Sequence, residues 1–225
     1  MNKNKVLDLF CGCGGLSHGF IEAGYEVVAG IDHWQDALDT FAFNHIKSKA
    51  IKADLFNVSP EQIAEQIDNK EIDVIIGGPP CQGFSIAGKR LIDDERNQLY
   101  KSFVEFVSYF KPEAFIMENV PNIISMGKGA VKDEIIEDFT NLGYTVTYKI
   151  LLASEYGVPQ NRRRAFFVGL KNGQTFDFPL PTTKDFVTCE QAISDLPDET
   201  IEDGEIYPVE AQSEYQRLMR VGSTV

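Results

Sequence analysis

The chain has 225 residues and a net charge of −13, and its apolar and charged fractions, 43% and 24%, are ordinary for a globular protein. This length is sufficient for one substantial hydrophobic core, and no apolar run is long enough to cross a membrane. Four cysteines do not make a disulfide framework in a chain of this length, and the amino terminus lacks a secretory signal, so a reducing, cytoplasmic location is expected.

Strand-like and helix-like segments alternate along the chain, indicated by short β-branched runs and by apolar residues three and four positions apart. The expected strands are Val6–Phe10, Glu26–Ile31, Ala50–Ala53, Ile72–Ile76, Ala114–Met117, Tyr144–Leu151 and Ala165–Leu170. The expected helices are Leu16–Ala23, one through Leu38, one opening at Ser59-Pro60, Leu99–Phe110, Val131–Leu142 and Ser213–Arg220. Repeated β-α-β units predict an α/β fold with a mostly parallel, twisted sheet and helices on both faces.

The alternation ends near Lys171, after which prolines and acidic residues are scattered along the chain. We therefore expect a compact α/β domain over residues 1–170 and an extended, acidic, proline-containing segment over residues 171–225.

A glycine turn joins the first expected strand to the first helix, over Asp8–Leu16. It departs from the dinucleotide fingerprint because Ser17 stands where the third glycine is required. Asp32 ends the second strand and is placed to bind the two hydroxyls of a ribose, and Asp54, after the third strand, is placed to accept from an adenine amino group. Glycines, two acids and no lysine for phosphates favour a nucleoside such as S-adenosylmethionine; the alternative is a tight turn with two solvated acids.

The loop after the fourth expected strand reads Gly78-Pro79-Pro80-Cys81-Gln82-Gly83-Phe84-Ser85. The two prolines fix the backbone ahead of Cys81, and ligands of open α/β sheets bind at the carboxyl ends of strands. A lone cysteine is usually a small buried hydrophobe. Here the rigid lead-in and the strand end favour a nucleophile.

The negative net charge argues against nucleic-acid binding at first sight, but the charge is unevenly distributed. Residues 171–225 contain eleven acidic and four basic residues, and this segment therefore supplies about half of the net negative charge. A local basic surface is expected near Lys89, Arg90, Arg96 and the run Arg162–Arg164, which a structured turn would carry.

Four separated segments together resemble the cytosine-C5 DNA methyltransferases. They are Asp8-Leu9-Phe10 with its glycines, Gly78–Ser85, Glu118-Asn119-Val120 and Gln160–Arg164, within residues 4–170. The resemblance implies a seven-stranded, Rossmann-like methyltransferase sheet, S-adenosylmethionine as cofactor and duplex DNA as substrate, in the manner of a bacterial modification methylase. The residues expected at the cofactor are Phe10, Gly12, Gly14, Asp32, Asp54, Pro80 and Leu99. Those expected at the DNA are Gln82, Ser85, Lys89 and Arg96, on or near a loop that closes over it.

The resemblance also implies the chemistry. The Cys81 thiolate adds to C6 of cytosine, Glu118 supplies a proton near N3, and Arg162 and Arg164 reach the cytosine carbonyl or a phosphate. C5 then attacks the cofactor methyl group, and loss of the C5 proton expels Cys81. The target base has to be flipped out of the duplex, since these atoms are not reachable in stacked DNA. A salt bridge at a strand end is the alternative for Glu118.

The target-recognition region and the two further motifs of complete family members do not occur within residues 1–225. We therefore expect either a subunit of a split enzyme, with a companion polypeptide that carries the recognition region, or a truncated form of a longer enzyme. A tRNA cytosine-C5 methyltransferase and a non-catalytic interaction protein on the same fold are the alternatives. No metal site is expected, because Cys11 and Cys13 are too closely spaced for a zinc knuckle. His18, His33 and His45 lie apart and are assigned no role.

Overall fold

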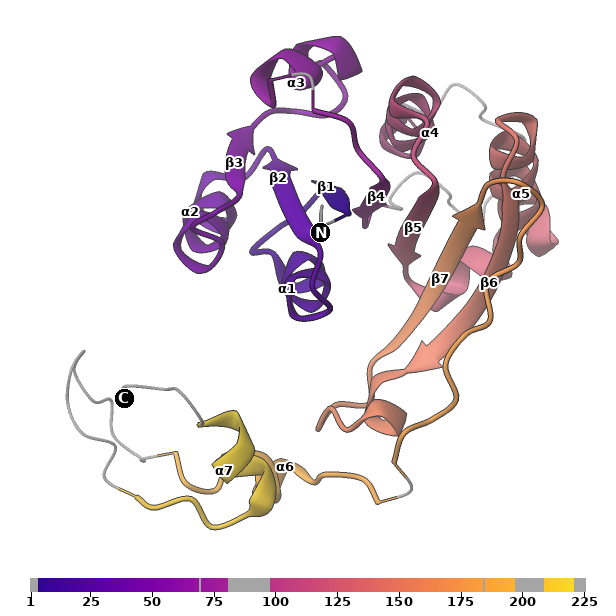
Figure 1. Ribbon diagram of the computed structural model, residues 1–225. Helices are drawn as coiled ribbons and strands as arrows, with labels where there is room; N and C mark the ends of the chain where they lie inside the picture. Colours follow the sequence, from indigo (N-terminus) through magenta and orange to yellow (C-terminus); the bar gives the residue numbers. More distant parts are fainter. Residues whose placement is uncertain (1–3, 69, 81–97, 184, 197–208, 221–225) are drawn as a thin grey trace. The chain divides into compact units, whose positions relative to one another are not determined.

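Seven strands form one mixed sheet in the order β3-β2-β1-β4-β5-β7-β6 (Figure 1). The strands are β1 (Lys5–Leu9), β2 (Glu26–Asp32), β3 (Lys49–Lys52), β4 (Val74–Gly77), β5 (Ala114–Asn119), β6 (Thr145–Leu152) and β7 (Arg163–Leu170). The four pairs that join β3, β2, β1, β4 and β5 are parallel, whereas β5 and β7 are antiparallel. The predicted mostly parallel, seven-stranded α/β sheet is confirmed.

The computed structural model describes residues 4–68, 70–80, 98–183, 185–196 and 209–220. The chain divides into two compact units. The sheet unit comprises Met1–Ile150 and Arg164–Phe178, and the helix-pair unit comprises Leu151–Arg163 and Pro179–Val225. The assignment of residues 1–170 to cofactor binding and catalysis, and of residues 171–225 to a segment leading toward a recognition domain, stays a prediction.

Helices cover both faces of the sheet, as predicted. The helices of the sheet unit are α1 (Gly15–Glu22), α2 (Gln35–Asn44), α3 (Pro60–Gln66), α4 (Gln98–Phe110) and α5 (Ala130–Asn141), with the short 3-10 helices η2 (Pro121–Ile124) and η3 (Met126–Gly129). Alternate residues of a strand point to opposite faces. Leu7, Ile75 and Phe115 accordingly lie in the core with α3, α4 and α5, whereas Val6 and Ile76 lie in a second core with α1 and α2.

Two aromatic residues of α4 belong to the core. Phe103 and Phe106 are fully buried. Phe103 makes edge-to-face contacts with Phe115 of β5 and Phe139 of α5, and the rings of Phe115 and Phe139 stack with centroids 3.9 Å apart. Such aromatic contacts add stabilisation beyond the burial of area, and they attach α4 and α5 to the centre of the sheet.

Local sequence sets the helix ends. The Ser59 side chain accepts a hydrogen bond from the backbone of Gln62, whose side chain bonds back, and Pro60 occupies the first turn of α3. Gly24, with φ of 92°, follows the last turn of α1 and its C-cap residue Ala23.

The helix-pair unit contains η4 (Ala153–Tyr156), α6 (Cys189–Ile193) and α7 (Glu214–Met219). Helix α7 confirms the predicted helix near residues 213–220, whereas α6 was not predicted. Polar contacts join the two helices: Ser213 Oγ donates to Gln191 O, Gln216 Nε2 donates to Ser194 Oγ, and Arg220 forms an ion pair with the buried Asp195. Within the residues that the structure describes, no helix has the length and apolar character needed to span a membrane.

Candidate active site

Five parallel strands place residues that are distant in sequence along one edge of the sheet. Their carboxyl ends lie at the same edge, which is where open α/β sheets bind ligands. In the order of the strands, this edge carries Asp54 after β3, Asp32 at the end of β2, the glycine turn Phe10–Gly14 after β1, Pro80 after β4, and Glu118 near the end of β5. The fold therefore brings these predicted site residues together at one edge.

The glycine turn has an unusual backbone. Phe10, Gly12 and Gly14 have φ angles of 60°, 53° and 89°, and this left-handed region is uncommon for a non-glycine residue such as Phe10. The amide of Cys11 donates to Ile31 O at 3.0 Å, which attaches the turn to β2. The turn is thus a fixed structure that leads directly into α1.

Asp32 is bonded to the glycine turn. Its Oδ2 accepts from the Gly12 amide at 2.9 Å, and its Oδ1 accepts from the Trp34 amide at 3.0 Å and lies 3.3 Å from His33 Nδ1. These contacts hold the carboxylate at the strand end, and Oδ2, with one partner, has a further lone pair for a ligand hydroxyl. This geometry fits the predicted ribose-binding role.

Asp54 is exposed and caps its own turn, with Oδ1 accepting from the Phe56 amide and Oδ2 from Asn57 Nδ2. Leu99 lies partly buried in the first turn of α4. Pro80 is partly buried, and the carbonyl of the preceding residue, Pro79, accepts from Asn119 Nδ2 at 2.9 Å. Asn119 is itself buried, and its hydrogen bond joins the end of β5 to the segment Pro79-Pro80 that precedes Cys81.

A buried carboxyl group lies beneath the glycine turn. Asp8 is 1% exposed, and its Oδ2 accepts from Ser17 Oγ at 2.6 Å. Burial raises the pKa of Asp8 to about 7, against the lowering effect of the Ser17 hydrogen bond. Asp8 was not predicted as a titrating group, because its burial depends on the packing of α1 against the sheet.

Cys11 is buried in the same region. Burial, followed by the charges of Asp8 and Asp32, raises the pKa of its thiol far above the ordinary value. The thiolate is the reactive form of cysteine, so the raised pKa disfavours Cys11 as a nucleophile. Cys11 thus serves as a small buried residue of the turn.

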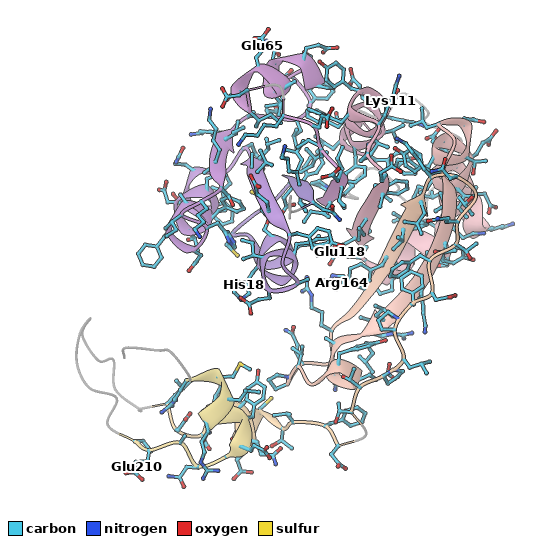
Figure 2. All side chains as sticks on the ribbon, viewed as in Figure 1. His18, Glu65, Lys111, Glu118, Arg164 and Glu210 are labelled. Carbon is cyan, nitrogen blue, oxygen red and sulfur yellow. The ribbon has the colours of Figure 1, made fainter. Side chains whose placement is uncertain are left out.

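Glu118 and Arg164 form an ion pair, with 2.8 Å between Glu118 Oε1 and Arg164 Nε (Figure 2). The structure therefore contains the salt bridge given above as the alternative for Glu118, and the role of Glu118 as a proton donor stays a prediction. The pair forms because β7 lies antiparallel beside β5, with Asn119 opposite Ala165. The other oxygen, Oε2, lies 3.4 Å from the position that a Cβ on Gly78 would take. Glu118 thus faces the backbone three residues before Cys81.

Several predicted residues are not placed at this site by the structure. Cys81, Gln82, Ser85, Lys89 and Arg96 lie outside the described residues. Arg162 belongs to the helix-pair unit, where its carbonyl accepts from the Ala153 amide. No group of three or more His, Cys, Asp or Glu side chains that would hold a metal ion occurs among the described residues.

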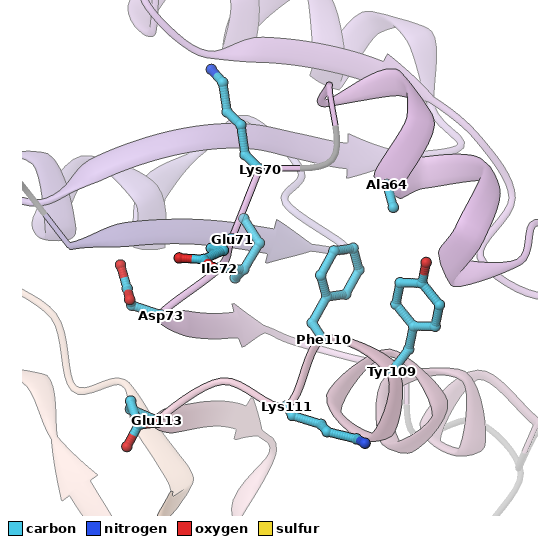
Figure 3. Close-up of a pocket in the computed structure, with 9 residues that line it drawn as sticks. All are labelled: Ala64, Lys70, Glu71, Ile72, Asp73, Tyr109, Phe110, Lys111 and Glu113. Carbon is cyan, nitrogen blue, oxygen red and sulfur yellow. The ribbon is translucent and has the colours of Figure 1, made fainter.

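A pocket of about 480 Å³ lies at the other edge of the sheet (Figure 3). Asp73 and Glu113, which immediately precede β4 and β5, line it together with Tyr109 and Phe110 at the end of α4. It therefore lies at the amino ends of the strands and takes no part in the candidate site.

Comparison with known proteins identifies the family. Residues 4–223 match the family model of the C-5 cytosine-specific DNA methylases. The chain is 45% identical to the Type II methyltransferase M.DdeI of Desulfomicrobium norvegicum, over 98% of this chain and 55% of that protein. It is 34% identical to the Type II methyltransferase M.AquIA of Picosynechococcus, over 88% of this chain and 91% of that protein.

A solved structure from E. coli, named as a prophage-encoded DNA modification methyltransferase, superimposes with a TM-score of 0.75 at 36% identity, over 88% of this chain and 56% of that one. The chain thus spans about half the length of M.DdeI and of this structure, and most of M.AquIA. The matched residues include the glycine turn, the segment Gly78–Ser85 and Glu118. The chain belongs to the C-5 cytosine-specific DNA methylase family.

Proposed function

We propose that this chain carries the catalytic domain of a modification methylase that transfers a methyl group from S-adenosylmethionine to C5 of cytosine in duplex DNA. The observation that carries the proposal is the position of Glu118, whose Oε2 faces Gly78 in the segment leading to Cys81. A proton donor and a nucleophile are thereby expected on neighbouring strand ends, β5 and β4, as addition to a cytosine ring requires.

The donor set of the glycine turn fits S-adenosylmethionine. Asp32 is held at the end of β2 with a lone pair of Oδ2 for a ribose hydroxyl, and the turn contains no lysine or arginine that would favour a phosphate chain. Acidic side chains suit the cationic ammonium and sulfonium groups of this cofactor. The residues proposed to hold it are Phe10, Gly12, Gly14, Asp32, Asp54, Pro80 and Leu99. When bound, the cofactor supplies an electrophilic methyl group.

The protein's part is to make C5 of cytosine nucleophilic. The Cys81 thiolate forms a bond to C6 while Glu118 donates a proton at N3, which relieves the negative charge on the ring. C5 would then take the methyl group, and the electron pair of the broken bond between sulfur and methyl would stay with the cofactor sulfur. Removal of the C5 proton returns its electron pair to the ring, the bond from C6 to Cys81 breaks with release of the thiolate, and the proton on N3 returns to Glu118. Arg164 holds Glu118, and Arg162 is proposed to contact the cytosine carbonyl or a phosphate.

DNA is favoured over RNA as the substrate because relatives at 34–45% identity are named Type II methyltransferases. Contacts to DNA are proposed for Gln82, Ser85, Lys89 and Arg96. A companion polypeptide that reads the bases also stays a proposal, since base-edge contacts are what specify a DNA sequence. A cytoplasmic location is also proposed, from the similarity to the Type II methyltransferases.

The test is transfer of labelled methyl groups from S-adenosylmethionine to duplex DNA, with tRNA as a parallel substrate and Cys81→Ser as the inactive control. We expect label at C5 of cytosine in DNA and none with Cys81→Ser. Label in tRNA alone would establish the alternative substrate, and label in neither substrate, with the companion polypeptide supplied, would contradict the proposed enzyme activity. Efficient methylation of one defined DNA sequence by residues 1–225 alone would contradict the need for a companion polypeptide.

A further inference from the structure

His45 lies directly beneath the glycine turn. It follows the last residue of α2, is 3% exposed, and packs its ring against Phe41 with centroids 4.6 Å apart. Its Nε2 lies 3.0 Å from the carbonyl oxygen of Gly14. A hydrogen bond therefore joins His45, at the end of α2, to Gly14, the N-cap residue of α1.

The Gly14 carbonyl also accepts from the His18 amide at 2.9 Å, the first hydrogen bond of α1. A Cβ on Gly14 would lie 2.2 Å from His45 Nε2 and 2.7 Å from the Phe41 ring. The His45 ring thus occupies the space that a side chain on residue 14 would take. The absence of a side chain on Gly14 therefore leaves the room that the His45 ring needs.

The hydrogen bond determines the tautomer. Because a carbonyl oxygen only accepts, Nε2 carries the proton, and Nδ1 is left without one. Nδ1 is buried and has no hydrogen-bond partner among the described residues. The ring N–H at Nε2 is therefore directed at the Gly14 carbonyl.

We infer that His45 is a positioning residue that holds the glycine turn in its cofactor-binding conformation through the Gly14 carbonyl. This inference rests on the proposed function, in which the turn binds S-adenosylmethionine. Gly12, two residues before Gly14, is bonded to Asp32, so a shift of the turn would move the carboxylate that is proposed to bind the ribose. His45 therefore acts on the cofactor through the turn without touching it.

The experiment compares His45→Gln with His45→Phe. The Gln side chain retains an N–H at about the same reach, whereas Phe retains a ring beside Phe41 and loses the donor. Asn44→Ala, at an exposed position in α2 next to His45, is the control for a substitution at this helix end. Three quantities are measured: the dissociation constant for S-adenosylmethionine by calorimetry, the melting temperature, and hydrogen–deuterium exchange of residues 12–18 in the protein without cofactor.

We expect His45→Phe to bind the cofactor about three- to tenfold more weakly, as the loss of one hydrogen bond predicts, and to exchange faster at residues 12–18. His45→Gln is expected to restore both quantities, and Asn44→Ala to change neither. Unchanged exchange in His45→Phe would overturn the inference. The inference would also be overturned if His45→Phe and His45→Gln lost cofactor affinity equally and in proportion to their losses in melting temperature. That result would indicate that His45 contributes through packing alone. If the wild type binds no cofactor, the proposed function fails, while the exchange data still decide whether His45 holds the turn.

Discussion

Arg164 Nε lies 2.8 Å from Glu118 Oε1, and the two side chains come from the antiparallel neighbours β7 and β5. The guanidinium occupies one oxygen of the carboxyl group, while the other faces Gly78. The ion pair thereby sets the direction in which Glu118 presents its second oxygen. The sequence analysis expects Arg164 to contact the cytosine carbonyl or a phosphate. In the structure, Arg164 also holds Glu118, the proposed proton donor.

Replacing Glu118 with Gln is expected to lower turnover by about 10²- to 10⁴-fold, the usual contribution of general acid catalysis. The dissociation constant for S-adenosylmethionine should stay within a few fold, because Glu118 is proposed to act on the base. Single-turnover methylation and cofactor binding are measured together. Glu113→Gln, an exposed carboxyl group just before the same strand, is the matched control. Lost cofactor binding with a retained single-turnover rate would assign Glu118 to the cofactor pocket instead.

Arg164→Lys keeps the positive charge but loses the planar fork that holds a carboxylate in one orientation. We expect turnover to fall by about tenfold or more, which is the loss expected for a hydrogen bond to a charged group. Cofactor affinity should be unchanged. Arg163→Lys, on the neighbouring residue of β7, provides the comparison, and the two variants are assayed for kcat and KM on the same DNA. Equal losses in both variants would argue against a specific role of Arg164 in holding Glu118.

The strands and most helices were predictable because they depend on local patterns. The start of helix α3, for example, is predicted by Ser59, Pro60 and Gln62, which lie within four positions of sequence. Helix α6 was missed because five residues carry too little periodicity, although Thr188 and Gln191 form a capping box that reads directly from the sequence. The ion pair of Glu118 and Arg164 was not predictable in detail, since it depends on the insertion of β7 between β5 and β6.

The buried groups at the glycine turn were the least predictable part of the site. His45 reaches Gly14 across 31 positions of sequence, and only the packing of α2 against the sheet brings them together. The same is true of the burial of Asp8, whose acidic side chain in a strand gives no sign that α1 covers it.

Gly14→Ala is expected to destabilise the protein strongly, by about 2–4 kcal/mol from left-handed backbone strain and overpacking together. The added Cβ would meet the His45 and Phe41 rings. Gly12→Ala is the matched variant, because Gly12 also has a positive φ, but a Cβ added there would meet no atom within 4 Å. It should lose only about 1 kcal/mol, the strain alone. Urea unfolding of both variants measures the difference, and equal losses would show that the His45 contact is not tight.

Asp8 is expected to make stability depend on pH. Its pKa is raised from 3.8 to about 7 in the folded state, so between these values the folded protein holds a proton that the unfolded chain has released. The free energy of unfolding contributed by Asp8 therefore falls as pH rises from about 4 to 7, by at most about 1.4 kcal/mol per pH unit. Asp8→Asn keeps an oxygen that accepts from Ser17 and removes the titration.

The measurement is the free energy of unfolding of both proteins at several pH values from 4 to 8. The wild type should approach Asp8→Asn in stability near pH 4 and fall below it as the pH rises. Asp36→Asn, at an exposed position in α2, controls for the loss of a surface charge. Parallel pH profiles for wild type and Asp8→Asn would contradict the raised pKa.

Cys81 is expected to form a covalent bond to the target base. Duplex DNA that carries 5-fluorocytosine should trap the enzyme in the presence of S-adenosylmethionine, because after methyl transfer the fluorine at C5 cannot leave as a proton does and the bond from C6 to sulfur persists. The trapped species is a denaturation-resistant protein–DNA complex, and peptide mass spectrometry identifies the modified residue. Cys81→Ser should abolish trapping, whereas Cys13→Ser, at an exposed cysteine in the glycine turn, should retain it. An adduct on another residue, or trapping that survives Cys81→Ser, would remove Cys81 from the mechanism while leaving the family assignment intact.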